Sequence, residues 1–497
     1  MDLTLRRSPT VLVGWLILAA TLVRIAFGMA LGLGVDESYM VAAGRVPGLG
    51  YFDHPPASWW LSWGAAQLAG NEAPIVVRLP FIGLAALSTW LMFRLGTAVA
   101  SETAGLCAAL LLTLSPVFGV TTGTWVLPDG PLDAALLGAA LCLMHALSSP
   151  APRGWWLGAG LCAGLALVSK YSAVLTIGGA AVFLLTSPRH RIWLRRPEPW
   201  LAASIAVLVF APVLVWNATH HWASFAFQGE RAAGLRFRPL APFAVLGGEA
   251  LFVLPWIWLP MMAAFVAALR RGPAVWRDWL LCCLGAPPIL AFALIAAWSS
   301  QRVLFHWAAP GYLMLFPLLG AEVARRLDRP WVRRALAGTA ALVVVSLAVV
   351  GTQVRFDWLH PVIAAVTRRD PDLDGIDWTS LRDELTAHGL LSADTIVGVP
   401  SWRDAGKIAY ALGPHTTVLC LNRDTRQFGF AAPVARFEGR DVLILSLDQP
   451  DRVAASLAPA FHSIESLQPV AISLAGHSVQ PVAVFLGRGL RDIWRPG

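Results

Sequence analysis

Side chains that could do chemistry gather next to the apolar stretches of the sequence. Asp36 and Glu37 follow directly after the first such stretch, and Asp53 and His54 come shortly after them. Carboxylates exchange protons with hydroxyl groups, and cations bind phosphate. Two acidic residues at the edge of hydrocarbon are costly unless they are used, so Asp36 is a candidate functional residue. A solvated loop is the alternative.

Similar residues recur later in the chain, again beside apolar stretches. Asp129 and Asp133 stand where the fourth stretch begins, and Lys170 stands in a very short turn between two stretches. The others are His220, His221, Glu230, Arg231, Arg236, Arg238, Gln301, Arg302 and His306. Whether these residues can act together depends on the elements that carry them.

Those elements are predicted to be membrane helices. Of the 497 residues, 57% are hydrophobic and 14% are charged, which is more apolar surface than one soluble core can bury. A spanning helix needs about 20 mostly apolar residues. Suitable stretches are 11–33, 79–99, 104–121, 131–148, 154–168, 171–187, 199–217, 243–269, 278–297, 307–324 and 334–351. Residues 1–351 are therefore predicted to form a polytopic α-helical domain with about eleven transmembrane helices.

Arginines predict the orientation of these helices. With the N-terminus inside, the inner loops hold Arg153, Arg189, Arg191, Arg195, Arg196, Arg270, Arg271, Arg277, Arg325, Arg326, Arg329, Arg333 and Arg334. Short loops rich in Arg and Lys stay on the cytoplasmic side. The candidate residues then lie on the outer side, many of them in the two long outer loops 34–78 and 218–242. We expect a multi-pass protein of the inner (plasma) membrane.

The segment 352–497 has a different character. Its charges are dense and it lacks an apolar run long enough to span, so it is predicted to be a small soluble domain on the periplasmic or extracellular side. Short runs of apolar residues, rich in β-branched side chains, predict strands at 395–400, 416–421, 441–446 and 479–486. Helices are expected near 379–388, 404–412 and 452–461. Together these elements indicate an α/β domain.

The composition argues against several other classes of protein. The net charge of +8 comes from arginines in short loops between apolar runs, which does not indicate a nucleic-acid partner. Five of the six cysteines lie in apolar runs, so neither a disulfide framework nor a zinc-finger spacing is indicated. The sequence shows no repeat of fixed period, which gives no support to an inverted-repeat transporter.

Several short motifs follow one another in a characteristic order. The main ones are Asp36-Glu37-Ser38-Tyr39, Tyr51-Phe52-Asp53-His54-Pro55-Pro56 and Arg78-Leu79-Pro80. Supporting motifs are Pro128-Asp129-Gly130-Pro131, Ser169-Lys170-Tyr171, Trp216-Asn217, His220-His221-Trp222 and His306-Trp307-Ala308-Ala309-Pro310. This order resembles the bacterial relatives of protein O-mannosyltransferases and aminoarabinose lipid A transferases (glycosyltransferase families 39 and 83). The resemblance implies a GT-C fold.

The resemblance also implies a reaction. It would be an inverting glycosyltransfer from a polyprenyl-phosphate-linked sugar to a glycolipid, lipopolysaccharide or protein acceptor at the outer face of the lipid bilayer. Asp36 matches the acidic residue after the first helix and is the implied general base. Asp129 matches a second acidic position that orients the acceptor or helps the base. Glu37 is either catalytic or a residue that caps and braces the loop.

Cations are implied to hold the donor phosphate. The first candidates are Lys170, Arg231 and His54, and further candidates are Arg45, Arg302 and His306. His54 stands where aminoarabinose-transferring relatives carry Lys, which leaves the donor sugar open.

A divalent metal is the one candidate cofactor. In some relatives a carboxylate and a histidine between the two long outer loops hold one, which points to Asp53 with His220 or His221, structural histidines being the alternative. The alternative function is a transporter or flippase of a lipid-linked sugar. Ionisable residues at the outer span ends favour the enzyme.

Overall fold

The computed structural model describes residues 8–232, 236–299, 302–360, 371–474 and 477–494. Its contacts divide the chain into two compact units. The first unit consists of residues 1–25, 49–58 and 79–345, and the second of residues 26–48, 59–78 and 346–497. The first long outer loop of the sequence analysis thus contributes to both units.

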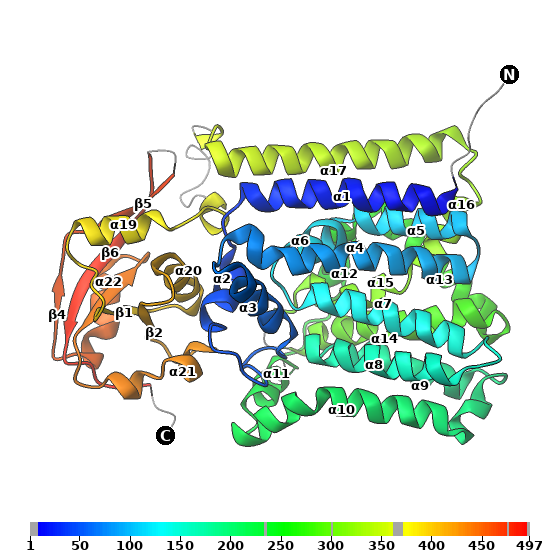
Figure 1. The fold of residues 1–497 in the computed structure, drawn as a ribbon, viewed down its shortest axis with the longest axis horizontal. Helices are drawn as coiled ribbons and strands as arrows, with labels where there is room; N and C mark the ends of the chain where they lie inside the picture. Colours follow the sequence, from blue (N-terminus) through cyan, green and yellow to red (C-terminus); the bar gives the residue numbers. More distant parts are fainter. Residues whose placement is uncertain (1–7, 233–235, 300–301, 361–370, 475–476, 495–497) are drawn as a thin grey trace. The chain divides into compact units, whose positions relative to one another are not determined.

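Helices make up the first unit (Figure 1). Four helices have residues in both units: α1 (Pro9–Ala30), α3 (Ala57–Ala69), α4 (Pro74–Val99) and α17 (Pro330–Phe356). The other elements of the first unit, with short 3-10 or π turns labelled η, are α5 (Glu102–Leu114), η1 (Val117–Thr121), α6 (Thr122–Thr124), α7 (Asp129–Ala146), α8 (Arg153–Ser169), α9 (Ala173–Thr186), η2 (Arg191–Arg195), α10 (Pro197–Thr219), α11 (Ala223–Ala232), α12 (Ala241–Val253), α13 (Pro255–Arg271), η3 (Gly272–Ala274), α14 (Trp276–Trp298), η4 (Phe305–Ala308), α15 (Ala309–Leu313) and α16 (Phe316–Ala324).

The prediction of a polytopic helical membrane protein is confirmed, but the number of eleven spans is not. Within the described ranges, five helices are long and apolar enough to cross a membrane: α1, α4, α10, α14 and α17. Three bent pairs raise the number to eight if each pair is one span. The predicted span 243–269, for example, is α12 and α13 with a bend of 114° between them. The bend falls at Pro255, which lacks the N–H that a continuous helix needs.

Small residues let the helices of the first unit approach closely. The helix pairs that pack side by side are α7 with α8, α8 with α10, α5 with α16, and α9 with α14. A Cβ atom on Gly160 of α8 would lie 2.4 Å from the carbonyl oxygen of Ala202 in α10, and one on Gly179 of α9 would lie 2.1 Å from that of Cys283 in α14. Close backbone packing of this kind holds helices together where hydrocarbon removes the hydrophobic driving force.

The second unit contains a small α/β domain. Its own elements are α2 (Val35–Ala43), η5 (Pro371–Asp374), α19 (Ser380–Ala387), β1 (Ile396–Val399), α20 (Trp402–Leu412), β2 (Thr417–Cys420), α21 (Phe428–Ala431), η6 (Val434–Phe437), β3 (Val442–Ser446), α22 (Pro450–Leu457), η7 (Ala458–Ala460), β4 (Ser463–Ser466), β5 (Val470–Leu474) and β6 (His477–Arg488). The sheet has the order β2-β1-β3-β6-β4, and β5 also pairs with β6. β1 is parallel to β2 and β3, whereas β6 is antiparallel to its partners.

The predicted α/β character of this domain is confirmed. The four predicted strands are β1, β2, β3 and β6, and the predicted helices are α19, α20 and α22. The helix α20 connects the parallel strands β1 and β2, and its other side packs against α2. A Cβ atom on Gly406 would lie 2.8 Å from the Cα atom of Tyr39, so glycine allows α20 to touch the backbone of α2.

Candidate functional site

A cation and a carboxylate predicted to be functional form an ion pair in the first unit. The Nζ atom of Lys170 lies 2.8 Å from Oδ1 of Asp129. Lys170 stands in the turn between α8 and α9, and Asp129 is the first residue of α7. The exposed fractions of the two side chains are 11% and 10%, so the pair is largely shielded from water. One of the three donors of the ammonium group is directed to Asp129.

Two histidines extend this pair into a group. Electrostatic interactions link Asp129 with Lys170, His306 and His54, which come from different segments of the first unit. We call these four residues the Lys170 group. All four were predicted from the sequence as site residues, and the structure brings them together. The group joins one ammonium group and two imidazole rings to one carboxylate, and such nitrogen donors suit the binding of a phosphate.

A cavity of about 120 Å³ lies beside Lys170. Its lining combines one ammonium group and one imidazole ring with hydroxyl, amide and apolar side chains. The lining residues are His54, Lys170, Tyr171, Ser172, Gln228, Phe292, Ile295 and Trp307. Helix α11 fixes this arrangement, because Ser224 shares a hydrogen bond of 2.7 Å with the hydroxyl of Tyr171, and Gln228 donates one of 2.6 Å to the carbonyl oxygen of Asp53.

The other predicted residues of the first unit lie outside the Lys170 group, although Asp133 interacts electrostatically with Asp129 and Lys170. Asp133 is buried and accepts a hydrogen bond of 2.7 Å from the hydroxyl of Thr122. Arg302 is exposed to solvent. Arg231 lies in α11, and its side chain falls outside the described part of the structure.

The structure gives no support to a metal site. Among the described residues, no group of three or more His, Cys, Asp or Glu side chains is placed to hold a metal ion. The ring of His220 stacks on Trp216 at 4.3 Å, and its Nδ1 atom lies 2.8 Å from the carbonyl oxygen of Trp216. His221 is exposed and has a positive φ of 54°. These contacts favour the structural alternative for the histidines over ligation together with Asp53.

Asp36 stands in the first turn of α2, in the second unit. Its side chain is exposed, yet the protein around the carboxylate removes part of its hydration and raises its pKa. The positive charges of Arg403 and Arg426 oppose this rise, whereas Glu37 and Asp374 add to it. The two arginines belong to α20 and to the segment after β2. A carboxylate that water can reach and that has a raised pKa is suited to proton transfer.

Glu37 has a different environment from its neighbour. It is 3% exposed, and Arg78 binds both of its carboxylate oxygens, Oε1 through Nε at 2.8 Å and Oε2 through Nη2 at 2.5 Å. Oε2 also accepts a hydrogen bond of 2.9 Å from the amide of Gly34, so the Glu37 side chain caps the backbone at the start of α2. This geometry favours the bracing role of Glu37 over the catalytic one.

Arg45 is also fully engaged within the second unit. Its guanidinium group donates to both carboxylate oxygens of Glu72, at 3.0 and 2.8 Å, and to the carbonyl oxygens of Ala409 and Gly413 in and just after α20. These contacts favour a structural role over the proposed binding of phosphate.

The sequence reasoning missed Lys407, a buried cation of α20. Its Nζ atom donates to the carbonyl oxygen of Leu33, directly before α2, at 2.7 Å. One signal in the sequence could have drawn attention to it. The chain has only two lysines, Lys170 and Lys407, among its 38 basic residues. A lysine in so arginine-rich a chain draws attention because its ammonium group is a compact charge, unlike the planar guanidinium group of arginine.

Comparisons with known proteins agree with this architecture. Residues 53–216 match the family described as dolichyl-phosphate-mannose-protein mannosyltransferase. The structure superposes on ArnT from Cupriavidus metallidurans bound to undecaprenyl phosphate with a TM-score of 0.66 and 14% identity, over 98% of this chain and 99% of that one. The apo form of the same protein gives a TM-score of 0.63. The chain therefore has the fold of the GT-C glycosyltransferases.

Two curated relatives share part of their sequence with this chain. The lipid A galacturonosyltransferase RgtD of Rhizobium johnstonii is 28% identical over 293 residues, which are 56% of this chain and 58% of the relative. An undecaprenyl phosphate-alpha-4-amino-4-deoxy-L-arabinose arabinosyl transferase of Proteus mirabilis is 24% identical over 56% of this chain and 51% of its own. The match thus spans little more than half the length of these relatives. The resemblance predicted from the motifs is confirmed.

Proposed function

We propose that this protein is an inverting glycosyltransferase. It moves a sugar from a polyprenyl-phosphate-linked donor to a glycolipid, lipopolysaccharide or protein acceptor at the outer face of the membrane. Both curated relatives are named as sugar transferases, and the solved ArnT structure holds undecaprenyl phosphate. The observation that carries the proposal is the Lys170 group beside its cavity.

Lys170 is proposed to hold the donor phosphate. When the bond between the sugar and the phosphate breaks, negative charge develops on the leaving phosphate oxygens. A positioned ammonium group in a partly dry site stabilises that charge more than water would. Asp129 holds the ammonium with one hydrogen bond and leaves two of its donors for the phosphate. His54 and His306 add donors or positive charge.

Asp36 is proposed as the general base. In an inverting transfer the acceptor hydroxyl attacks the anomeric carbon, the bond from that carbon to phosphate oxygen breaks, and the hydroxyl proton passes to a carboxylate. The exposure of Asp36 and its raised pKa suit this role. Asp129 is committed to Lys170, which supports an orienting role for it. We also propose that the second unit's α/β domain is periplasmic or extracellular, as the arginine bias of the loops indicates.

The proposal is tested on purified protein in lipid vesicles. Polyprenyl-phosphate donors with different sugars are offered together with lipid A, and the products are read by mass spectrometry. The expected result is one sugar added to the acceptor and release of polyprenyl phosphate. A protein that binds polyprenyl phosphate but adds no sugar to lipid A or to any glycolipid or protein of the membrane extract would overturn the proposal.

A transporter or flippase of a lipid-linked sugar is the second candidate. The three bent helix pairs favour it, because broken helices are typical of transporters. The same vesicles separate the two functions. A flippase moves labelled donor between leaflets without breaking the bond from sugar to phosphate, whereas the transferase consumes it.

A further inference from the structure

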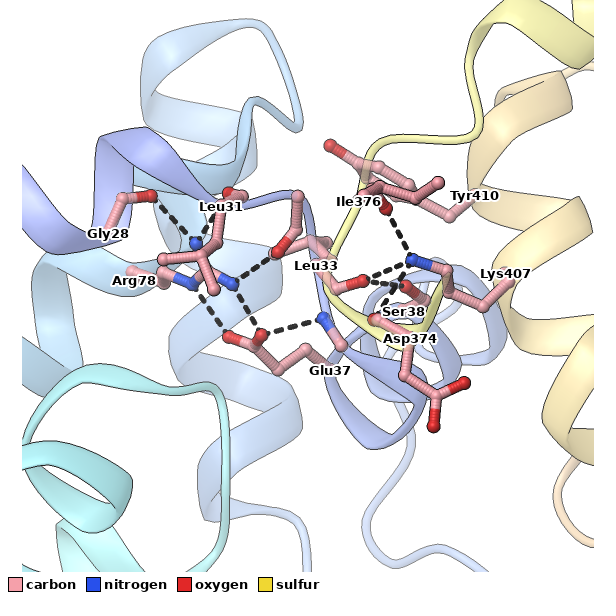
Figure 2. A network of polar contacts seen from close by, with 12 residues as sticks. Gly28, Leu31, Leu33, Glu37, Ser38, Arg78, Asp374, Ile376, Lys407 and Tyr410 are labelled. Carbon is pink, nitrogen blue, oxygen red and sulfur yellow. Dashed lines mark hydrogen bonds and ion pairs between the residues drawn. The ribbon is translucent and has the colours of Figure 1, made fainter. Parts of the chain in front are cut away.

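Two cations cap the end of α1 and the segment that follows it (Figure 2). The last carbonyl groups of a helix have no partner within the helix. Arg78 donates to the carbonyl oxygens of Gly28 at 2.7 Å, Leu31 at 3.0 Å and Gly32 at 2.8 Å. The next carbonyl oxygen, that of Leu33, accepts from Lys407 at 2.7 Å. Cations at a helix C-terminus also interact favourably with the helix dipole.

Lys407 uses its three donors on backbone carbonyl groups. Besides Leu33, its ammonium donates to Ile376 at 2.8 Å and to Asp374 at 3.3 Å, as Figure 2 shows. The residue is 3% exposed, and its Nζ atom lies 5.0 Å from the ring centre of Trp378. Burial lowers the pKa of Lys407 to about 8. An ammonium group is costly to bury, so its three carbonyl partners offset a real desolvation cost.

Lys407 contacts the backbone just before Asp36 and the backbone of a residue whose charge acts on Asp36. Leu33 lies three residues before Asp36, at the entry to α2. Asp374 contributes negative charge to the surroundings of Asp36, and its carboxylate lies 3.6 Å from Arg403, which contributes positive charge. Lys407 therefore holds both the backbone that leads into the helix of Asp36 and a residue that sets its charge environment.

The rest of α2 is docked on the α/β domain by tight packing. The hydroxyl of Tyr39 accepts a hydrogen bond of 2.9 Å from the amide of Gln427. The ring of Tyr39 meets the ring of Trp402 edge-on at 5.2 Å. Gly406 leaves room for the backbone of α2, as described above. The middle of α2 is thus fixed without Lys407. At the first turn Lys407 acts beside the brace of Glu37 and beside the hydroxyl of Ser38, which donates a hydrogen bond of 3.1 Å to the same Leu33 carbonyl oxygen.

We propose that Lys407 is a positioning residue for Asp36. It holds the Leu33 carbonyl and the Asp374 backbone so that the Asp36 carboxylate keeps its direction and its charged surroundings. The α/β domain then contributes to catalysis, because Lys407 of α20 positions the proposed general base, Asp36. This inference rests on the proposed function of Asp36, but its test includes a readout that needs no sugar transfer.

The test compares Lys407→Met with Lys407→Arg. Methionine keeps the length of the side chain and removes the ammonium, whereas arginine retains a cation that can reach carbonyl groups. A catalytic group that is misplaced by about 1 Å costs on the order of a hundredfold in rate. We expect kcat to fall by about tenfold to a hundredfold in Lys407→Met. Polyprenyl phosphate binding should stay within about twofold, and Lys407→Arg should recover part of the rate.

The second readout is a thiol placed at position 36. Asp36→Cys is introduced into a protein whose six native cysteines are replaced. The rate of alkylation of the new thiol is measured against pH to obtain its pKa, once with Lys407 and once with Lys407→Met. Positioning by Lys407 predicts a shift of the thiol pKa by half a unit or more, because the thiol moves relative to Arg403, Arg426, Glu37 and Asp374. An unchanged thiol pKa together with an unchanged kcat would overturn the inference.

Arg45→Met is the matched control for general loosening. Arg45 also ties the N-terminal part of the second unit to α20, through Ala409 and Gly413. Its loss should lower the unfolding temperature without moving the pKa of the thiol at position 36. If Arg45→Met shifts that pKa as much as Lys407→Met does, Lys407 is only structural. If the thiol shifts in Lys407→Met but the parent protein transfers no sugar, the proposed function fails and the positioning stands.

Discussion

At the scale of single residues, Asp36 and Glu37 are neighbours with opposite surroundings. Asp36→Asn should slow transfer to a hydroxyl acceptor by about a hundredfold to ten-thousandfold, because asparagine keeps the size and loses the base. Glu37→Gln should instead destabilise the fold by about 3 kcal/mol, because it leaves buried Arg78 without its counter-charge. Rates with a purified acceptor and unfolding temperatures of both variants check this. Asp36→Asn with normal activity, beside an inactive Asp129→Asn, would exchange the two roles.

The pKa of Asp36 predicts a pH dependence. An unfolded aspartate releases its proton near pH 3.9, and the folded one does so at higher pH. The base must be ionised, so the acid limb of the kcat/KM profile should have its midpoint above pH 3.9. Between the two pKa values the folded state binds more protons than the unfolded state, so stability falls slightly as the pH rises. An acid limb at or below 3.9 would contradict the assignment.

Lys170 is expected to dominate the binding of the donor phosphate. Lys170→Met should weaken the binding of polyprenyl phosphate by about tenfold to a hundredfold. The reason is that one charge-assisted contact, worth about 1.5–3 kcal/mol, is lost. Trp307 lines the same cavity, so tryptophan fluorescence can report the binding. Arg153→Met is the control, since the side chain of Arg153 is 86% exposed. If the parent protein, Lys170→Met and Arg153→Met bind polyprenyl phosphate with equal affinity, Lys170 has a structural role only.

The sequence could predict the Lys170 group but not the role of Lys407. Lys170, Asp129 and His54 stand next to apolar stretches, and hydropathy with the arginine bias places such positions on one side of a membrane. Lys407 instead acts on Leu33, which is 374 residues away, in a contact between side chain and backbone. A carbonyl group is present in every residue, so no motif marks such a partner.

At the scale of elements, adjacent glycines of α9 provide a test of helix packing. A Cβ atom on Gly178 would meet nothing within 4 Å, whereas one on Gly179 would lie 2.1 Å from the carbonyl oxygen of Cys283 in α14. Gly178→Ala should therefore be neutral or stabilising by up to about 1 kcal/mol. Gly179→Ala should destabilise by about 1–3 kcal/mol, because α14 has to move.

Thermal unfolding in detergent micelles checks this pair of variants. The two substitutions add the same methyl group at neighbouring positions of one helix, so differences in helix propensity cancel. If both variants unfold at the same temperature, α9 and α14 are not packed as described.

The elements were predicted where one physical pattern decides the structure. Long apolar stretches gave the long helices, and short apolar runs gave β1, β2, β3 and β6. The bends were missed, because whether a proline such as Pro255 separates two helices, or stays inside one as Pro212 does in α10, depends on tertiary packing. β4 was missed because it is largely exposed at the end of the sheet order, where no apolar run marks it.

At the scale of the whole molecule, the arginine bias predicts an orientation that labelling can test. In a protein without native cysteines, thiols introduced at Val46 and Arg452 should react with a reagent that cannot cross the membrane. One at Arg195 should react only after the membrane is permeabilised. Labelling of Arg195→Cys from outside in intact cells would contradict the orientation. If the reagent labels Arg452→Cys but not Val46→Cys, the two positions lie on opposite sides of the membrane. The predicted number of spans between them would then be wrong.

The discontinuous second unit also imposes an order in time. Glu37 and its partner Arg78 leave the ribosome close together, so their ion pair can form early in synthesis. Lys407 follows Leu33 by 374 residues, which takes roughly 20–75 s at 5–20 residues per second. During that interval α2 has its brace but neither Lys407 nor the surface of α20. Under the proposed role of Lys407, an unfinished chain carries an Asp36 whose surroundings are incomplete until α20 has been made.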